Sequence, residues 1–139
     1  MFVCTGNICR SPMAEYLARH LTQGDGIVFS SAGTATHAGV SPSSGTNTVM
    51  AEIGIGIVWH RSRSVWQDDE TADLIYALSA EHRRAMVARW PGRADDIHML
   101  SPNGESIDDP YGMELEAYRR SRDQIAEAVR ARVETGWKP

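Results

Sequence analysis

Apolar positions along the chain follow two spacings, one typical of short buried strands and one typical of helices. Four short runs, rich in β-branched and aromatic side chains, predict strands over residues 1–3, 27–29, 73–78 and 97–100. Apolar side chains three and four residues apart, with residues that begin or end helices, predict helices over 12–22, 46–53, 79–88 and 113–133. This alternation is typical of an α/β domain. Its parallel four-stranded sheet has helices on both faces and binds its ligand at the carboxyl ends of the strands.

The composition is that of one folded domain. A chain of 139 residues with 42% hydrophobic side chains can bury one core, so we expect a single domain over residues 1–139. The net charge of −4 gives no support for nucleic-acid binding. No run approaches the roughly 18–20 apolar residues of a membrane-spanning helix, and no secretory signal precedes Cys4. Two cysteines are too few for a disulfide framework, so we expect a cytoplasmic protein with no membrane partner.

A loop that can hold an anion follows the first predicted strand. Residues 4–12 are Cys-Thr-Gly-Asn-Ile-Cys-Arg-Ser-Pro, between the end of a strand and the start of a helix. Backbone N–H groups in such a loop point inward, and the helix dipole favours negative charge. Gly6 and Asn7 can adopt the positive φ that a tight anion-binding turn needs, and Pro12 suits the first turn of a helix. The segment therefore predicts a phosphate-binding loop.

Cys4 and Arg10 supply this loop with groups suited to phosphoryl transfer. The positive field of the loop favours a thiolate at Cys4, and a thiolate that faces a bound phosphate is a nucleophile. The planar guanidinium of Arg10 fits two phosphate oxygens and can stabilise the charge of the transition state. Ser11 can donate a hydrogen bond to the sulfur, which matters most when sulfur is the leaving group.

Two interpretations without catalysis stand beside this one. The Cys-x5-Arg spacing alone is a weak signal, although its position between a strand and a helix opened by Ser-Pro is far more demanding. Cys4 could be a buried structural residue at the end of a strand. The loop could also be a non-catalytic module that binds phosphorylated partners, but such a module needs neither a thiol nor a nearby acid.

Over nearly its whole length the chain resembles the low-molecular-weight protein tyrosine phosphatase family, in its bacterial type. Residues 4–15, Cys-Thr-Gly-Asn-Ile-Cys-Arg-Ser-Pro-Met-Ala-Glu, are similar to the phosphate loop of that family. Ser-Ala-Gly-Thr at 31–34, His-Arg-Ser-Arg at 60–63 and Asp-Pro-Tyr-Gly at 109–112 resemble its later motifs in order and spacing. The resemblance implies a flavodoxin-like three-layer sandwich and a cysteine-dependent phosphatase whose partners are phosphorylated proteins or peptides.

The resemblance also implies the chemistry and its residues. Cys4 attacks phosphorus to form a cysteinyl-phosphate, Arg10 clamps the phosphate, and Asp109 acts as general acid and then as general base. Physical reasoning leaves open which of the neighbours Asp108 and Asp109 faces the site, and the Asp-Pro match selects Asp109. The other residues implied in phosphate or substrate binding are Thr5, Gly6, Asn7, Ile8, Cys9, Ser11, His37 and Tyr111. Of these, Tyr111 and His37 would form opposite walls of a substrate slot.

Four residues match positions that form a hydrogen-bond network under the phosphate loop in this family: Asn7, Ser11, Ser31 and His60. Such a network would hold Asn7 in a strained backbone conformation and orient Ser11. The second thiol, Cys9, matches a cysteine that can form a reversible disulfide with the nucleophile. A small buried hydrophobic role for Cys9 is equally open.

Substrate preference depends on Ile8. One branch of the family removes phosphate from arginine and has threonine at this position, whereas isoleucine is usual in the tyrosine branch. We therefore expect phosphotyrosine as the substrate, with a protein arginine phosphatase as the alternative. Arsenate reductases share the fold and the loop, but their chemistry relays oxidation through further cysteines, and Cys9 is the only other cysteine here.

No cofactor is implied by the sequence. The five histidines have no metal-ligand spacing, and neither a Walker lysine nor a Gly-x-Gly-x-x-Gly motif occurs. We expect a monomer. Only three residues precede Cys4, where the family has a longer first strand, so we also expect the native start to lie upstream of Met1.

Overall fold

A four-stranded parallel sheet lies at the centre of the computed structural model, which describes residues 1–68 and 72–137. Its strands are β1 (Phe2–Cys4), β2 (Ser31–Gly33), β3 (Ile75–Ala77) and β4 (Ile97–Met99), in the spatial order β2-β1-β3-β4. Phe2 pairs with Ser31 on one side and with Tyr76 on the other, and all neighbouring strands are parallel. The predicted sheet is confirmed.

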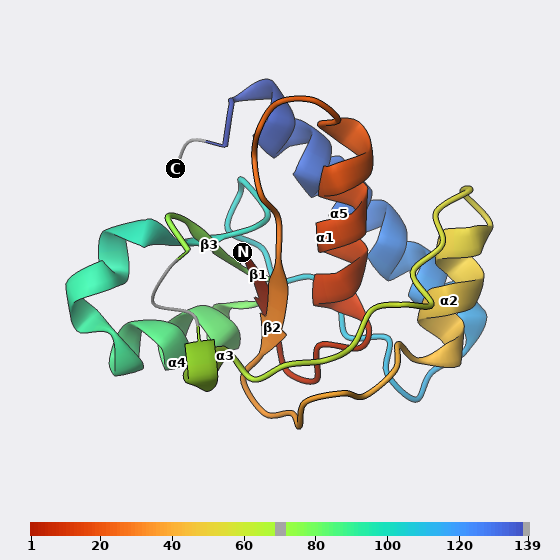
Figure 1. Ribbon diagram of the computed structural model, residues 1–139, viewed down its shortest axis with the longest axis horizontal. Helices are drawn as coiled ribbons and strands as arrows, with labels where there is room; N and C mark the ends of the chain where they lie inside the picture. The colour runs from red at the N-terminus through yellow and green to blue at the C-terminus, as the bar shows by residue number, and fades with distance from the viewer. Residues whose placement is uncertain (69–71, 138–139) are drawn as a thin grey trace.

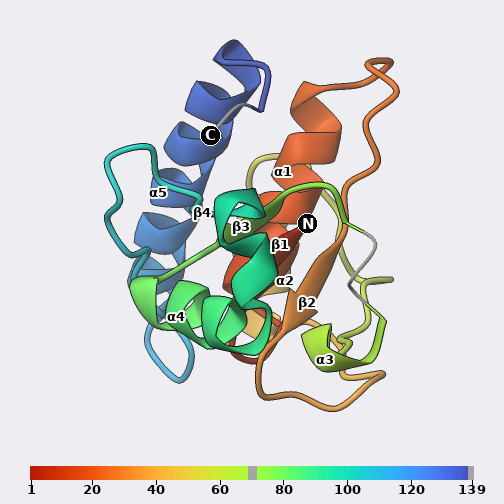
Figure 2. The same cartoon turned by 90° about the vertical axis from the view of Figure 1, so that its left-hand side faces the viewer.

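Helices cover both faces of this sheet (Figures 1 and 2). On one face lie α1 (Arg10–Leu21), α2 (Ser44–Ala51) and α5 (Leu115–Glu134). On the other lie α3 (Val65–Asp68), α4 (Ala80–Arg89) and the 3₁₀ turn η2 (Pro91–Asp96). Among the described residues, no helix combines the length and the apolar composition that crossing a bilayer requires.

Alternate residues of the strands pack into two separate apolar clusters. Phe2 and Tyr76 face the first cluster, where their rings pack with Phe29 and Trp137 beneath α1 and α5. Val3 faces the second cluster, on the side of α3 and α4. Side chains alternate between the faces of a strand, so a β1 of three residues can anchor both cores.

The strand predicted over 27–29 is wrong in position. The strand begins at Ser31, while Ile27 and Val28 are 47% and 90% exposed and only Phe29 is buried. The register explains the shift, because Ser31 pairs with Phe2 and residues 27–29 lie beyond the paired segment of β1. A β-branched run is compatible with a strand, but hydrogen-bonding partners decide where the strand lies.

The remaining elements agree with the prediction to within a few residues. The helix predicted from residue 12 begins at Arg10, and the last helix runs from Leu115 to Glu134. Ser79 caps α4, because its hydroxyl accepts the backbone N–H of His82 at 3.3 Å. The 3₁₀ turn η2 was not predicted.

Candidate active site

The predicted phosphate loop connects the carboxyl end of β1 to the N-terminus of α1. Asn7 lies within this loop with φ of 55°, a left-handed conformation that asparagine adopts more readily than most residues. The loop is held close to the end of β2, since the backbone N–H of Thr34 donates to the Cys4 carbonyl at 2.9 Å. The nucleophile predicted from the sequence therefore stands where the sheet, the loop and the helix dipole meet.

The Cys4 thiol is almost fully buried at the base of this loop. It is 2% exposed, and its Sγ lies 3.0 Å from the Oγ of Ser11. Asn7 Nδ2 donates to that same Ser11 oxygen at 2.8 Å. Ser11 therefore keeps its own hydrogen for the Cys4 sulfur or for the Ala32 carbonyl, 3.4 Å away.

Arg10 is buried with part of its donor capacity unused. One Nη donates to the Ile107 carbonyl at 3.0 Å, and the other lies 3.3 Å from a carboxylate oxygen of Asp109. Its Nε is buried and has no hydrogen-bond partner among the described residues. A buried donor without a partner is costly, so this nitrogen indicates an anion that belongs beside it.

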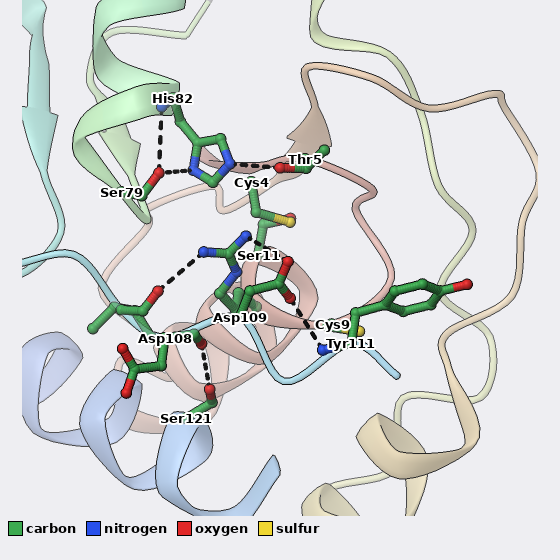
Figure 3. A network of polar contacts seen from close by, with 12 residues as sticks. Cys4, Thr5, Cys9, Ser11, Ser79, His82, Asp108, Asp109, Tyr111 and Ser121 are labelled. Atoms are coloured by element: carbon green, nitrogen blue, oxygen red, sulfur yellow. Dashed lines mark hydrogen bonds and ion pairs between the residues drawn. The ribbon is translucent and has the colours of Figure 1, made fainter. Parts of the chain in front are cut away.

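The structure resolves the choice between the two neighbouring aspartates (Figure 3). Asp109 faces Arg10 and Cys4, and its Oδ1 accepts the backbone N–H of Tyr111 at 3.1 Å. Asp108 turns toward α5, where its carbonyl accepts the hydroxyl of Ser121. Of the two carboxyl groups, it is that of Asp109 that lies beside Arg10 at the loop.

The four residues predicted to form a network under the loop are hydrogen-bonded to one another through Asn7. Its Nδ2 donates to Ser31 at 2.9 Å as well as to Ser11, and its carbonyl accepts the Nε2–H of His60 at 2.7 Å. Burial lowers the pKa of His60, which favours the neutral ring. Glu15 was not predicted as a site residue. Its carboxylate accepts the Ser31 hydroxyl at 2.5 Å and thereby extends this network into α1.

A cavity of ≈ 340 Å³ opens in front of the loop. The predicted residues that line it are Cys4, Thr5, Gly6, Ile8, Cys9, Arg10, His37, Asp109 and Tyr111. Asn7, Ser11, Ser31 and His60 do not line it, because they lie beneath the loop. Ala35, Thr36 and Val40 line it without having been predicted. No motif marks these three. Ala35 is held at the site by its own backbone N–H, which donates to the Thr5 carbonyl at 3.0 Å.

Cys9 and Cys4 are both free thiols. Cys9 Sγ lies 3.2 Å from Ser43 Oγ and 3.8 Å from the hydroxyl of Tyr118. Burial raises the pKa of the Cys9 thiol, so its protonated form is favoured. In this state the residue is a small buried side chain with polar neighbours.

His82, which was not predicted as a site residue, also contacts the start of the loop. Its Nε2 lies 2.8 Å from Thr5 Oγ1, and burial, with Arg10 nearby, lowers its pKa to about 4. The available signal was its place in the first turn of a helix that follows a strand next to β1. Among the described residues, no three His, Cys, Asp or Glu side chains are grouped so that they could hold a metal ion.

Residues 1–135 match the family model described as low molecular weight phosphotyrosine protein phosphatase. A probable low molecular weight protein-tyrosine-phosphatase of Ralstonia solanacearum is 33% identical over 133 residues, covering 94% of this chain and 90% of that protein. A protein-arginine-phosphatase of Geobacillus stearothermophilus is 33% identical, over 90% of this chain and 86% of that protein. An arsenate reductase of Brevibacillus brevis is 35% identical, over 97% of this chain and 93% of that protein. The crystal structure of a low molecular weight protein tyrosine phosphatase from T. tengcongensis is 35% identical with a TM-score of 0.88, covering 96% of both chains.

Proposed function

The chain belongs to the low molecular weight phosphotyrosine protein phosphatase family, and we propose that it hydrolyses phosphotyrosine through a cysteinyl-phosphate on Cys4. One observation carries this proposal. A buried thiol, a buried guanidinium with an unpartnered Nε, and the carboxyl group of Asp109 border the same cavity. That combination supplies a nucleophile, an anion clamp and a proton donor for phosphoryl transfer.

In the first step the Cys4 thiolate attacks phosphorus in line with the leaving phenolic oxygen. The S–P bond forms as the P–O bond breaks, and Asp109 donates its proton to the departing oxygen. Arg10 holds two phosphate oxygens and balances their charge, using the Nε that has no partner among the described residues. The loop N–H groups and the α1 N-terminus add further positive potential.

In the second step a water molecule attacks the phosphorus of the cysteinyl-phosphate. Asp109, now ionised, removes a proton from that water, and the S–P bond breaks to release inorganic phosphate. The sulfur leaves as a thiolate, and Ser11 at 3.0 Å donates a hydrogen bond that stabilises it. The enzyme returns to its starting state without a metal or an organic cofactor in the sequence of steps.

The walls of the cavity favour an aromatic substrate. Ile8, Val40 and Tyr111 present apolar or aromatic surface to a bound ring. A phosphoarginine would bring a guanidinium, which needs carboxylate or amide acceptors, and Asp109 is the one carboxylate among the described lining residues. The Geobacillus stearothermophilus relative keeps the protein arginine phosphatase as the second candidate.

The other candidates have less support. An arsenate reductase would need a relay of further cysteines, whereas this chain holds only Cys4 and Cys9. A binding module would have no use for an acid beside the thiol. A cytoplasmic location and a monomeric state stay predictions.

The test is phosphate release from two peptides that differ only in phosphotyrosine or phosphoarginine, with EDTA present. We expect release from phosphotyrosine, and its loss in Cys4→Ser. Faster release from phosphoarginine would contradict the assignment of Ile8 while retaining the mechanism. Bound phosphate without release from either peptide would favour the binding module.

A further inference from the structure

His82 lies in the first turn of α4, where the helix begins at the carboxyl edge of the sheet. In a parallel α/β fold this edge also carries the phosphate loop, and β3 is hydrogen-bonded to β1. The helix that follows β3 therefore begins close to Cys4. The side chain of His82 is 2% exposed and points from α4 toward Thr5 (Figure 3).

The two ring nitrogens of His82 connect two hydroxyl groups. Nδ1 lies 2.8 Å from Ser79 Oγ, and Nε2 lies 2.8 Å from Thr5 Oγ1. In either neutral tautomer one nitrogen donates and the other accepts, so both hydroxyls are satisfied. Burial and the nearby Arg10 disfavour the charged ring, so His82 adds no charge to the anion site at neutral pH.

Thr5 is the residue directly after the nucleophile and is held from two sides. Its carbonyl accepts the N–H of Ala35 at 3.0 Å, which ties the main chain to the segment after β2. Its hydroxyl is tied to α4 through His82. Thr5 itself is exposed, so packing alone does not fix it. The Asn7 network, by contrast, fastens the middle of the loop from below.

We propose that His82 is a positioning residue for phosphoryl transfer, which holds Thr5 and thereby the first turn of the phosphate loop in its anion-binding form. This role rests on the proposed function and deepens it. His82 does not touch the reacting atoms. It acts through Thr5, whose main chain continues from the sulfur-bearing Cys4. The competing role is purely local, in which His82 serves only the Ser79 cap of α4.

Two substitutions separate these roles. His82→Asn places a polar atom near the position of Nδ1 and keeps the Ser79 contact, but it cannot reach Thr5. His82→Gln places its amide near the position of Nε2 and can reach Thr5. We expect His82→Asn to lower kcat/KM for a phosphotyrosine peptide about fivefold to tenfold, the effect of one lost hydrogen bond, and His82→Gln to recover most of that loss.

A double-mutant cycle tests whether the effect passes through Thr5. Thr5→Val removes the hydroxyl with little change of shape and should lower kcat/KM by a similar factor. The double variant His82→Asn/Thr5→Val should then be no more than about twofold below either single variant, because one contact is lost only once. His98→Asn, at a partly buried histidine of β4, is the matched control and should keep the wild-type rate.

The dissociation constant for inorganic phosphate, measured by calorimetry on the same variants, keeps this test independent of turnover. We expect this constant to rise in His82→Asn and in Thr5→Val, and to rise no further in the double variant. If the wild type releases no phosphate, the proposed function fails and the binding series still tests His82. Three outcomes would overturn the positioning role. In the first, His82→Asn leaves both kcat/KM and the dissociation constant unchanged. In the others, His82→Gln is as impaired as His82→Asn, or the two losses multiply in the double variant.

Discussion

At the scale of single residues, the guanidinium of Arg10 is a better anion ligand than any other cation could be in its place. It is buried, it is fixed by Ile107 and Asp109, and its Nε is left for a phosphate oxygen. Arg10→Lys keeps the charge but loses the planar fork. We expect kcat/KM for phosphotyrosine to fall by about two orders of magnitude, as when a transition-state donor is removed. Steady-state kinetics checks this expectation, with Arg130→Lys, at an exposed position of α5, as the control. A loss of kcat/KM below tenfold in Arg10→Lys would contradict it.

Tyr111 acts at the mouth of the cavity, where its ring is 65% exposed. If this ring packs against the substrate ring, Tyr111→Ala should raise KM for phosphotyrosine peptides about threefold to tenfold, the value of one aromatic contact. Inhibition by inorganic phosphate, which has no ring, should be unaffected. Trp59→Ala is the matched control, because Trp59 is 86% exposed and is not among the residues that line this cavity. An unchanged KM in Tyr111→Ala would remove Tyr111 from the substrate slot.

At the scale of elements, the end of β2 has to lie against the phosphate loop, and Gly33 makes this approach possible. A Cβ at Gly33 would lie 2.5 Å from the Thr5 carbonyl oxygen and 2.8 Å from the Thr36 methyl group. Gly33→Ala should therefore displace the loop, destabilise the fold by about 1–3 kcal/mol and lower kcat. Gly56→Ala, whose Cβ would meet no atom within 4 Å, should change neither quantity. Urea unfolding and steady-state kinetics on both variants test this expectation. Equal free energies of unfolding and equal kcat values in the two variants would contradict the steric argument.

The arrangement of the elements explains which parts of the site could be predicted from the sequence. The loop from Cys4 to Ser11 is contiguous, so its residue types and its place between strand and helix are visible in the sequence. Ala35, Thr36 and His82 have no motif of their own and join the site only through the parallel order of the sheet. The misplaced strand at 27–29 has the same origin, because a local apolar run does not contain the register with β1.

At the scale of the whole molecule, buried His82 links the stability of the fold to pH. Its pKa is about 4 in the folded chain, below the ordinary value of 6.5 that applies in the unfolded chain. As pH falls, the unfolded chain therefore binds the proton first. Stability is therefore lost from about pH 6.5 down to about pH 4. Between pH 7 and pH 5 the loss from this residue is about 2 kcal/mol. The charged groups facing the ring are Arg10, which opposes its protonation, and Asp109, which favours it.

His82→Gln removes this titration and keeps the contact with Thr5, so it isolates the pH-dependent part. In urea unfolding, the free energy of unfolding of the wild type should fall more steeply between pH 7 and pH 5 than that of His82→Gln. The difference between the two slopes should amount to the same ~2 kcal/mol. The buried His60 also has a lowered pKa and loses stability in the same direction, but it is present in both proteins and cancels. Parallel curves would mean that His82 titrates alike in the folded and unfolded chains, and that the ring is not held neutral beside Arg10.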